Sequence, residues 1–178
     1  VYALLAATDN HGRPQSLGIV TDLVRAGADP LQQIPDYGSP AGAMARSNDP
    51  SYMKALLDGG LDPNSMSYYR PLIFNAATDN SFAVLKLLVS SGADVNQPDS
   101  AGKTAIIVAL AGMQLDQVEY LLNHGADPTI ASDWLRFNKM LYNAIERERN
   151  SNQRTRDKLE QIRQLAVSKG MQWPPEPR

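Results

Sequence analysis

The sequence predicts an all-α fold of about five stacked helix-turn-helix units with short hairpin-like loops, ending in an irregular capping unit. A short segment recurs along the 178 residues: an apolar pair, then a glycine, then an aspartate two positions later. Its clearest glycines are Gly27, Gly60, Gly92 and Gly125, at intervals of 33, 32 and 33 residues. A fixed period of this length is the sequence signature of a repeat architecture.

Each unit can be divided into two helices and a turn. The second helix is predicted by apolar residues at helical spacing. They are Ile19, Val20, Leu23 and Val24; Tyr52, Met53, Leu56 and Leu57; Val84, Leu85, Leu87 and Leu88; and Val118, Leu121 and Leu122. The first helix is short and rich in small residues, so neighbouring pairs can approach closely. The glycine ends the second helix in left-handed backbone, and the aspartate bonds the turn that follows. Because one unit cannot bury its apolar face alone, the units must stack.

The segment Gly102-Lys-Thr-Ala-Ile-Ile-Val-Ala109 and the repeated Gly-Ala-Asp helix ends resemble the ankyrin-repeat family, with its pattern Gly-x-Thr-Pro-Leu-His-x-Ala. The resemblance covers residues 2–130 well and 131–173 loosely. It implies one domain over residues 1–178, with units near 1–34, 35–67, 68–100, 101–133 and 134–173 and an insertion near 146–157. Gly42, Phe74 and Ile107 replace the family's histidine, so its usual hydrogen bond between repeats is expected to be missing.

Composition and charge narrow the classes of function. There is no cysteine, which excludes disulfides, thiol catalysis and thiolate metal sites. No apolar run approaches the roughly 20 residues of a membrane helix, so we expect no membrane insertion. Residues 1–130 hold 7 Lys and Arg against 13 Asp and Glu, whereas residues 131–178 hold 10 against 6. In residues 131–178 basic residues are interleaved with acidic ones, which favours ion pairs on a solvated face over nucleic-acid binding.

Catalytic groups are scarce. His11 and His124 both fall in turns, where a polar exposed residue is usual. Four aspartates recur once per repeat at the same place, so one structural cause explains them all; they are Asp29, Asp62, Asp94 and Asp127. We therefore expect no catalytic residue, no metal site and no cofactor, and a small-molecule ligand is not expected.

The ankyrin resemblance implies a protein partner on the concave face and on the loop fingers near residues 31–38, 62–71, 94–103 and 128–137. Tyrosine, tryptophan and arginine most often anchor interfaces. The predicted partner-binding residues in and beside these fingers are Tyr37, Tyr68, Tyr69, Arg70, Lys103, Trp134 and Arg136. Two alternatives stay open: Trp134 plugs the base of the last unit, or Tyr37 and Tyr69, at matching positions one repeat apart, share a packing role.

The predicted function is a non-catalytic protein–protein interaction module. The turn from Leu57 to Asn64 resembles those of small stand-alone bacterial ankyrin proteins, which suggests a bacterial binder or inhibitor of one cognate protein, similar to an immunity protein. The alternatives are an adaptor that bridges two partners and, third, an enzyme. Val1 in place of Met is consistent with a processed or trimmed N-terminus, so periplasm and cytoplasm both stay open.

Overall fold

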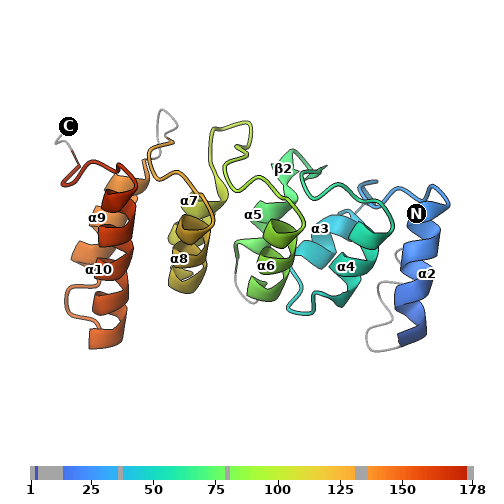
Figure 1. The fold of residues 1–178 in the computed structure, drawn as a ribbon, viewed down its shortest axis with the longest axis horizontal. Helices are drawn as coiled ribbons and strands as arrows, with labels where there is room; N and C mark the ends of the chain where they lie inside the picture. The colour runs from blue at the N-terminus through green and yellow to red at the C-terminus, as the bar shows by residue number, and fades with distance from the viewer. Residues whose placement is uncertain (1–2, 4–13, 36–37, 79–80, 131–135, 176–178) are drawn as a thin grey trace. The chain divides into compact units, whose positions relative to one another are not determined.

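The computed structural model describes residues 3, 14–35, 38–78, 81–130 and 136–175, and in these ranges it confirms an all-α fold (Figure 1). The helices gather into two compact units, Val1–Asp94 and Val95–Arg178. Unit 1 contains α2 (Pro14–Arg25), α3 (Pro40–Ala45), α4 (Ser51–Asp58), β1 (Met66–Ser67), β2 (Arg70–Pro71), α5 (Leu72–Ala76) and α6 (Phe82–Ser90). Unit 2 contains α7 (Ala105–Ala111), α8 (Leu115–Asn123), α9 (Phe137–Arg147) and α10 (Gln153–Ser168).

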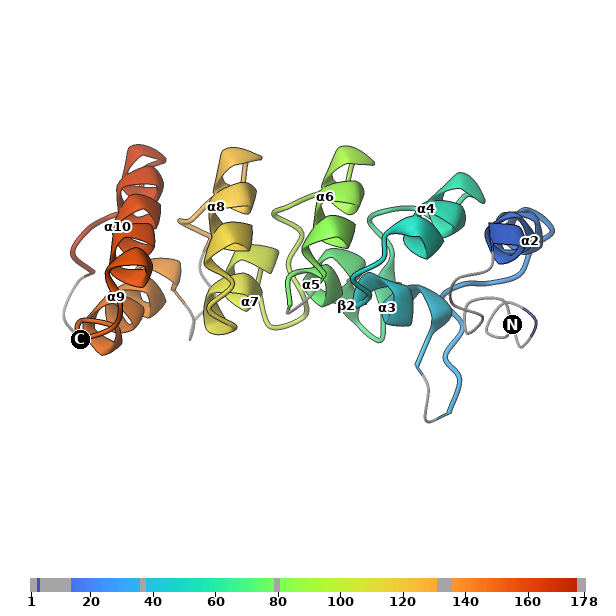
Figure 2. The ribbon, with the colours of Figure 1, turned by 90° about the horizontal axis from the view of Figure 1, so that it is seen from below.

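Unit 1 is two layers of helices. Figure 2 shows α2, α4 and α6 in one row and the shorter α3 and α5 in the other. The core lies between the rows, where the apolar stripes predicted from the sequence are fully buried at Met53, Leu56, Leu85 and Leu88. The first helices contribute small or apolar side chains to the same core, because α3 reads Pro-Ala-Gly-Ala-Met-Ala and α5 begins with Leu-Ile-Phe.

Unit 2 repeats this arrangement with longer helices at its C-terminal end. The pair α7 and α8 is followed by α9, of 11 residues, and α10, of 16 residues. The insertion expected near residues 146–157 overlaps the end of α9 and the beginning of α10. The helix α10 begins after Asn152, whose Oδ1 accepts a hydrogen bond from the backbone N–H of Thr155 at 2.9 Å. Lys158 of α10 lies 2.7 Å from a carboxylate oxygen of Asp116 and of Glu119, which links α10 to α8.

All five repeats end their second helix in the same way. The glycines Gly27, Gly60, Gly92, Gly125 and Gly170 have φ between 90° and 113°. The residue after each donates its backbone N–H to the carbonyl five positions earlier, as from Ala28 to Leu23 at 2.9 Å and from Met171 to Ala166 at 3.1 Å. This is the Schellman motif, which needs left-handed backbone at the glycine. Gly170 therefore ends a helix in the same way as the other four glycines.

Two asparagines join successive repeats. Asn64 donates its side-chain N–H to the carbonyl of Gly92 at 3.3 Å and accepts from the N–H of Asp94 at 2.7 Å. In unit 2, Asn96 donates to Gly125 at 2.9 Å and accepts from the N–H of Asp127 at 2.8 Å. Each amide therefore satisfies one backbone donor and one acceptor in the next repeat's turn. These bonds connect successive repeats within each unit.

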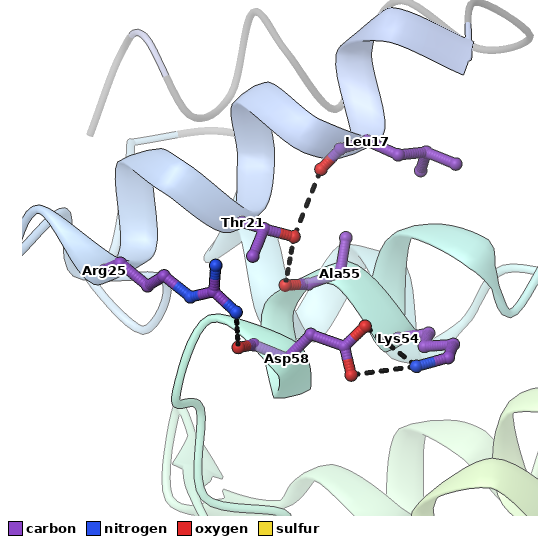
Figure 3. Close-up of polar contacts among 6 residues, drawn as sticks. All are labelled: Leu17, Thr21, Arg25, Lys54, Ala55 and Asp58. Atoms are coloured by element: carbon purple, nitrogen blue, oxygen red, sulfur yellow. Dashed lines mark hydrogen bonds and ion pairs between the residues drawn. The ribbon is translucent and has the colours of Figure 1, made fainter.

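The first repeat departs from the predicted stripe. Val20 is buried, but Ile19 is 52% exposed, so its assignment to the core was wrong. The reason is that α2 contacts α4 through a side that does not include Ile19. The Thr21 hydroxyl lies 3.1 Å from the carbonyl of Ala55, and Arg25 donates to the carbonyl of Asp58 at 3.2 Å (Figure 3).

Candidate protein-binding site

The finger between α4 and α5 is a β-hairpin with an unusual turn. Met66 pairs with Pro71 and Ser67 with Arg70, which leaves only Tyr68 and Tyr69 in the loop. Their φ angles are 51° and 62°. Positive φ at both central residues is the pattern of a type I′ turn, where Asn-Gly is the usual sequence. Left-handed backbone is an outlier for bulky residues, so this turn holds two of them against their local preference.

Neither tyrosine is buried, so burial of its ring does not offset the backbone strain. Tyr68 is 74% exposed and Tyr69 is 77% exposed. Their rings contact each other edge to face, with centroids 5.8 Å apart and planes at 65°. The exposure rules out a packing role for Tyr69, which the sequence had left open. Both rings therefore project into solvent from a structured finger.

The base of the hairpin is fixed to the preceding repeat. The Ser67 hydroxyl hydrogen-bonds the Ser39 hydroxyl at 2.6 Å, and Ser39 also caps α3 by accepting from the N–H of Gly42 at 3.1 Å. Both serines are buried. A Cβ at Gly42 would lie 2.5 Å from Ser67 Oγ. The absence of a side chain at Gly42 is therefore what lets the hairpin approach α3.

A groove of about 620 Å³ lies between this hairpin, the preceding loop and the first helices of unit 1. The loop contributes Ile34 and Pro35, and the hairpin contributes Tyr68. Two exposed guanidinium groups line it, from Arg46 at the end of α3 and Arg70 of the hairpin. No acidic residue is among its described lining residues, and neither arginine forms an ion pair with a residue that the structure describes. The described part of the lining is therefore cationic.

The other predicted residues are placed differently. Lys103 is half-buried in unit 2, where its backbone N–H donates to Asp99 Oδ1 at 2.9 Å. Arg136 is exposed at the start of α9, beside a smaller cavity of about 250 Å³. Tyr37 and Trp134 lie outside the described residues. The structure thus brings Tyr68, Tyr69 and Arg70 together on one finger, and it adds Arg46, which the sequence patterns had not singled out.

His124 lies outside the groove and contacts the helix that precedes it. His124 is exposed, stacks on Tyr120 with centroids 3.9 Å apart, and has its Nδ1 2.8 Å from the carbonyl of Tyr120. Among the residues that the structure describes, no group of three or more His, Cys, Asp or Glu could hold a metal ion. No helix in the described ranges has the length and apolar character to span a membrane.

Some basic side chains of the C-terminal end pair with acidic residues of the same end. Arg163 forms an ion pair with Glu160, and Arg149 Nη1 lies 3.6 Å from a carboxylate oxygen of Glu146. The hydrogen bond from Arg163 lowers the pKa of Glu160, although partial burial opposes it, and Gln164 adds a second hydrogen bond to the same carboxylate. These pairs agree with the expected solvated face.

Comparison with known proteins identifies the repeats. A model of ankyrin repeats, in three copies, matches residues 41–132, more than half of the chain. The chain belongs to the ankyrin-repeat family. The fold is thereby established as an all-α ankyrin-repeat solenoid, and ankyrin repeats indicate a protein–protein interaction module, a kind of domain that is generally non-catalytic.

Three relatives share between 29% and 33% identity with parts of this ankyrin-repeat protein. They are glycerophosphocholine phosphodiesterase gde1 of Schizosaccharomyces pombe, 33% identical over 49% of the chain; the ankyrin repeat and KH domain-containing protein mask-1 of Caenorhabditis elegans, 32% over 46%; and the human transient receptor potential cation channel subfamily A member 1, 29% over 58%. The matches span 8%, 3% and 10% of those proteins. The chain therefore spans a tenth or less of their length. All three are eukaryotic, so the bacterial character expected from the sequence stays a prediction.

Proposed function

We propose that this ankyrin-repeat protein binds one cognate protein and inhibits it, with the Tyr68–Tyr69 hairpin as its anchor. The observation that carries the proposal is the pair of exposed tyrosines held in left-handed backbone. Folding gains little from this choice, because Asn-Gly would fit the turn better and neither ring is buried. Strained backbone with no local compensation points toward function.

The chemistry of the finger suits a protein interface. Burying a tyrosine ring covers a large area with little loss of conformational entropy, and the hydroxyl can still hydrogen-bond at the interface. The turn presents the two rings together, and the hydrogen bond between Ser67 and Ser39 holds their base in place. The finger is therefore largely preorganised, and less entropy is lost when a partner covers it.

Inhibition would follow from covering the partner's functional surface with the finger and the adjoining groove. An adaptor that bridges two partners is the second candidate, because the basic end of unit 2 could supply another surface. The ion pairs of that end, such as Arg163 with Glu160, already neutralise part of its charge. That favours one principal surface, in unit 1.

Capture from a lysate of the native source tests the proposal. The full chain should retain one dominant protein at near-equal stoichiometry, and adding the chain should reduce that protein's activity. Replacing both tyrosines, Tyr68→Ala with Tyr69→Ala, should weaken binding by about 2 kcal/mol or more, which is the size of an interface hot spot. The control is Tyr142→Ala, an exposed tyrosine of unit 2, which should bind as the wild type does. A diffuse set of captured proteins, or equal binding by both variants, would refute the proposal.

A further inference from the structure

The described lining of the groove beside the hairpin is basic, whereas the unit that contains it is acidic overall. Residues 1–94 carry 6 Lys and Arg against 9 Asp and Glu. The described lining of the groove nevertheless contains two arginines and no acidic residue. We infer that this groove accepts a short, extended, acidic segment of a protein partner, with carboxylates on Arg46 and Arg70. This inference rests on the proposed function and specifies the partner's chemistry.

The two arginines are available for a ligand. Both are exposed, and neither forms an ion pair with any residue in the described part of unit 1. An Arg–carboxylate pair can be bidentate, which supplies direction as well as attraction. A second cation in the same groove favours a segment with more than one carboxylate.

The remaining lining favours a peptide over a small anion. The side chains of Gln33 and Asn75 are amides, which can both donate to and accept from an extended backbone. Ile34 and Pro35 give apolar contact for a side chain between the carboxylates, and Tyr68 borders the same space. A volume of about 620 Å³ holds several residues' side chains, far more than one inorganic anion requires.

Selection from a library of random seven-residue peptides displayed on phage, with the full chain as bait, tests this inference. Recovered peptides should be enriched in Asp and Glu around an apolar or aromatic residue. A synthetic copy, labelled with fluorescein, should bind the wild type, and Arg46→Gln and Arg70→Gln should each weaken it about tenfold or more. The matched control is Lys54→Gln, which removes the same charge from α4, where Lys54 pairs with Asp58. It should change binding less than threefold.

Three outcomes would overturn the inference. They are recovery of no binding peptide, peptides without acidic enrichment, and equal losses from the Lys54 and arginine variants. Preferential binding of a labelled single-stranded RNA, abolished by Arg70→Gln, would assign the groove to another class of partner. The proposed function has its own test, because capture of a cognate protein through the tyrosines can succeed even where the acidic peptide fails.

Discussion

The turn at Tyr68 and Tyr69 offers a test in which stability and binding should move in opposite directions. The perturbation is Tyr68→Asn with Tyr69→Gly, which places the usual type I′ sequence in the same two-residue loop. The strands on either side, paired at Ser67 with Arg70, are unchanged. If the tyrosines are held there for a partner, the variant should be more stable than the wild type and should bind less well.

The expected magnitude follows from the backbone. A non-glycine residue in left-handed backbone costs about 1–2 kcal/mol, and two such residues occur in succession, at φ 51° and 62°. Glycine removes that cost at position 69 and asparagine reduces it at position 68, while the extra freedom of glycine in the unfolded chain returns roughly 0.5–1 kcal/mol. Little burial is lost, because both rings are more than 70% exposed. The net gain is therefore about 1–2 kcal/mol.

Thermal and urea unfolding of the full chain measure this gain. For a chain of this size, 1 kcal/mol corresponds to about 2–4 °C in melting temperature, so the variant should melt a few degrees higher. The control is the pair Tyr68→Ala and Tyr69→Ala, which removes the rings and keeps the strained backbone. Its melting temperature should stay close to that of the wild type.

Two results would refute this reasoning. A lower melting temperature for the Asn-Gly variant would mean that the rings stabilise the folded chain. A similar rise for the Ala-Ala control would mean that the strain lies elsewhere than in the backbone of the turn. Either result would remove the observation on which the proposed function rests.

Three further predictions concern the scaffold. Gly59→Ala should lower the free energy of unfolding by about 1–3 kcal/mol, because the added Cβ would lie 2.7 Å from Cβ of Val24. The control is Gly112→Ala, whose added Cβ has no contact closer than 3.5 Å. In the same urea titration, the control should unfold as the wild type does. Asn96→Ala should cost about 1 kcal/mol by leaving two backbone groups of the next turn without their partner, and unchanged unfolding would contradict the proposed link. Burial lowers the pKa of Lys158, but its hydrogen bonds to two carboxylates of α8 outweigh this and raise the pKa overall. The stability that this ion pair adds is complete below the pKa of the unfolded chain and is lost as pH rises through the pKa of the folded chain. The free energy of unfolding of wild type should therefore exceed that of Lys158→Gln by about 1 kcal/mol at pH 8, and this difference should shrink toward pH 11. A difference that stays constant with pH would argue against the ion pair.

The repeat architecture was predictable because its signals are local. Gly27, Gly60, Gly92 and Gly125 each stand where left-handed backbone ends a helix, and the structure gives all four a positive φ. The aspartate two positions later behaves as predicted too, since Asp29 Oδ1 accepts from the N–H of Leu31 at 2.8 Å. Both features depend on a few neighbouring residues: the φ of a glycine, and the hydrogen bond of a side chain to a residue two positions away. A short sequence pattern can therefore predict them.

The groove was less predictable because it depends on contacts between repeats. Arg46 follows a helix of small residues and has no periodic counterpart, so only the approach of the Ser67 hairpin to α3 reveals that it lines a groove. The left-handed backbone of the tyrosines was also hidden, because two bulky residues in a turn give no local signal for positive φ. In contrast, the exposure of Tyr68 followed correctly from its place in a finger.

Site-specific photocrosslinking tests the central claim, that the Tyr68–Tyr69 finger contacts the partner. The photoreactive p-benzoylphenylalanine would replace Tyr68 in one protein and, as the control, Ile19, an exposed apolar residue of α2 in the same unit. On irradiation with the captured partner, position 68 should give a covalent product of one chain with one partner, and position 19 should not. Crosslinking at position 19 with none at position 68 would contradict the account.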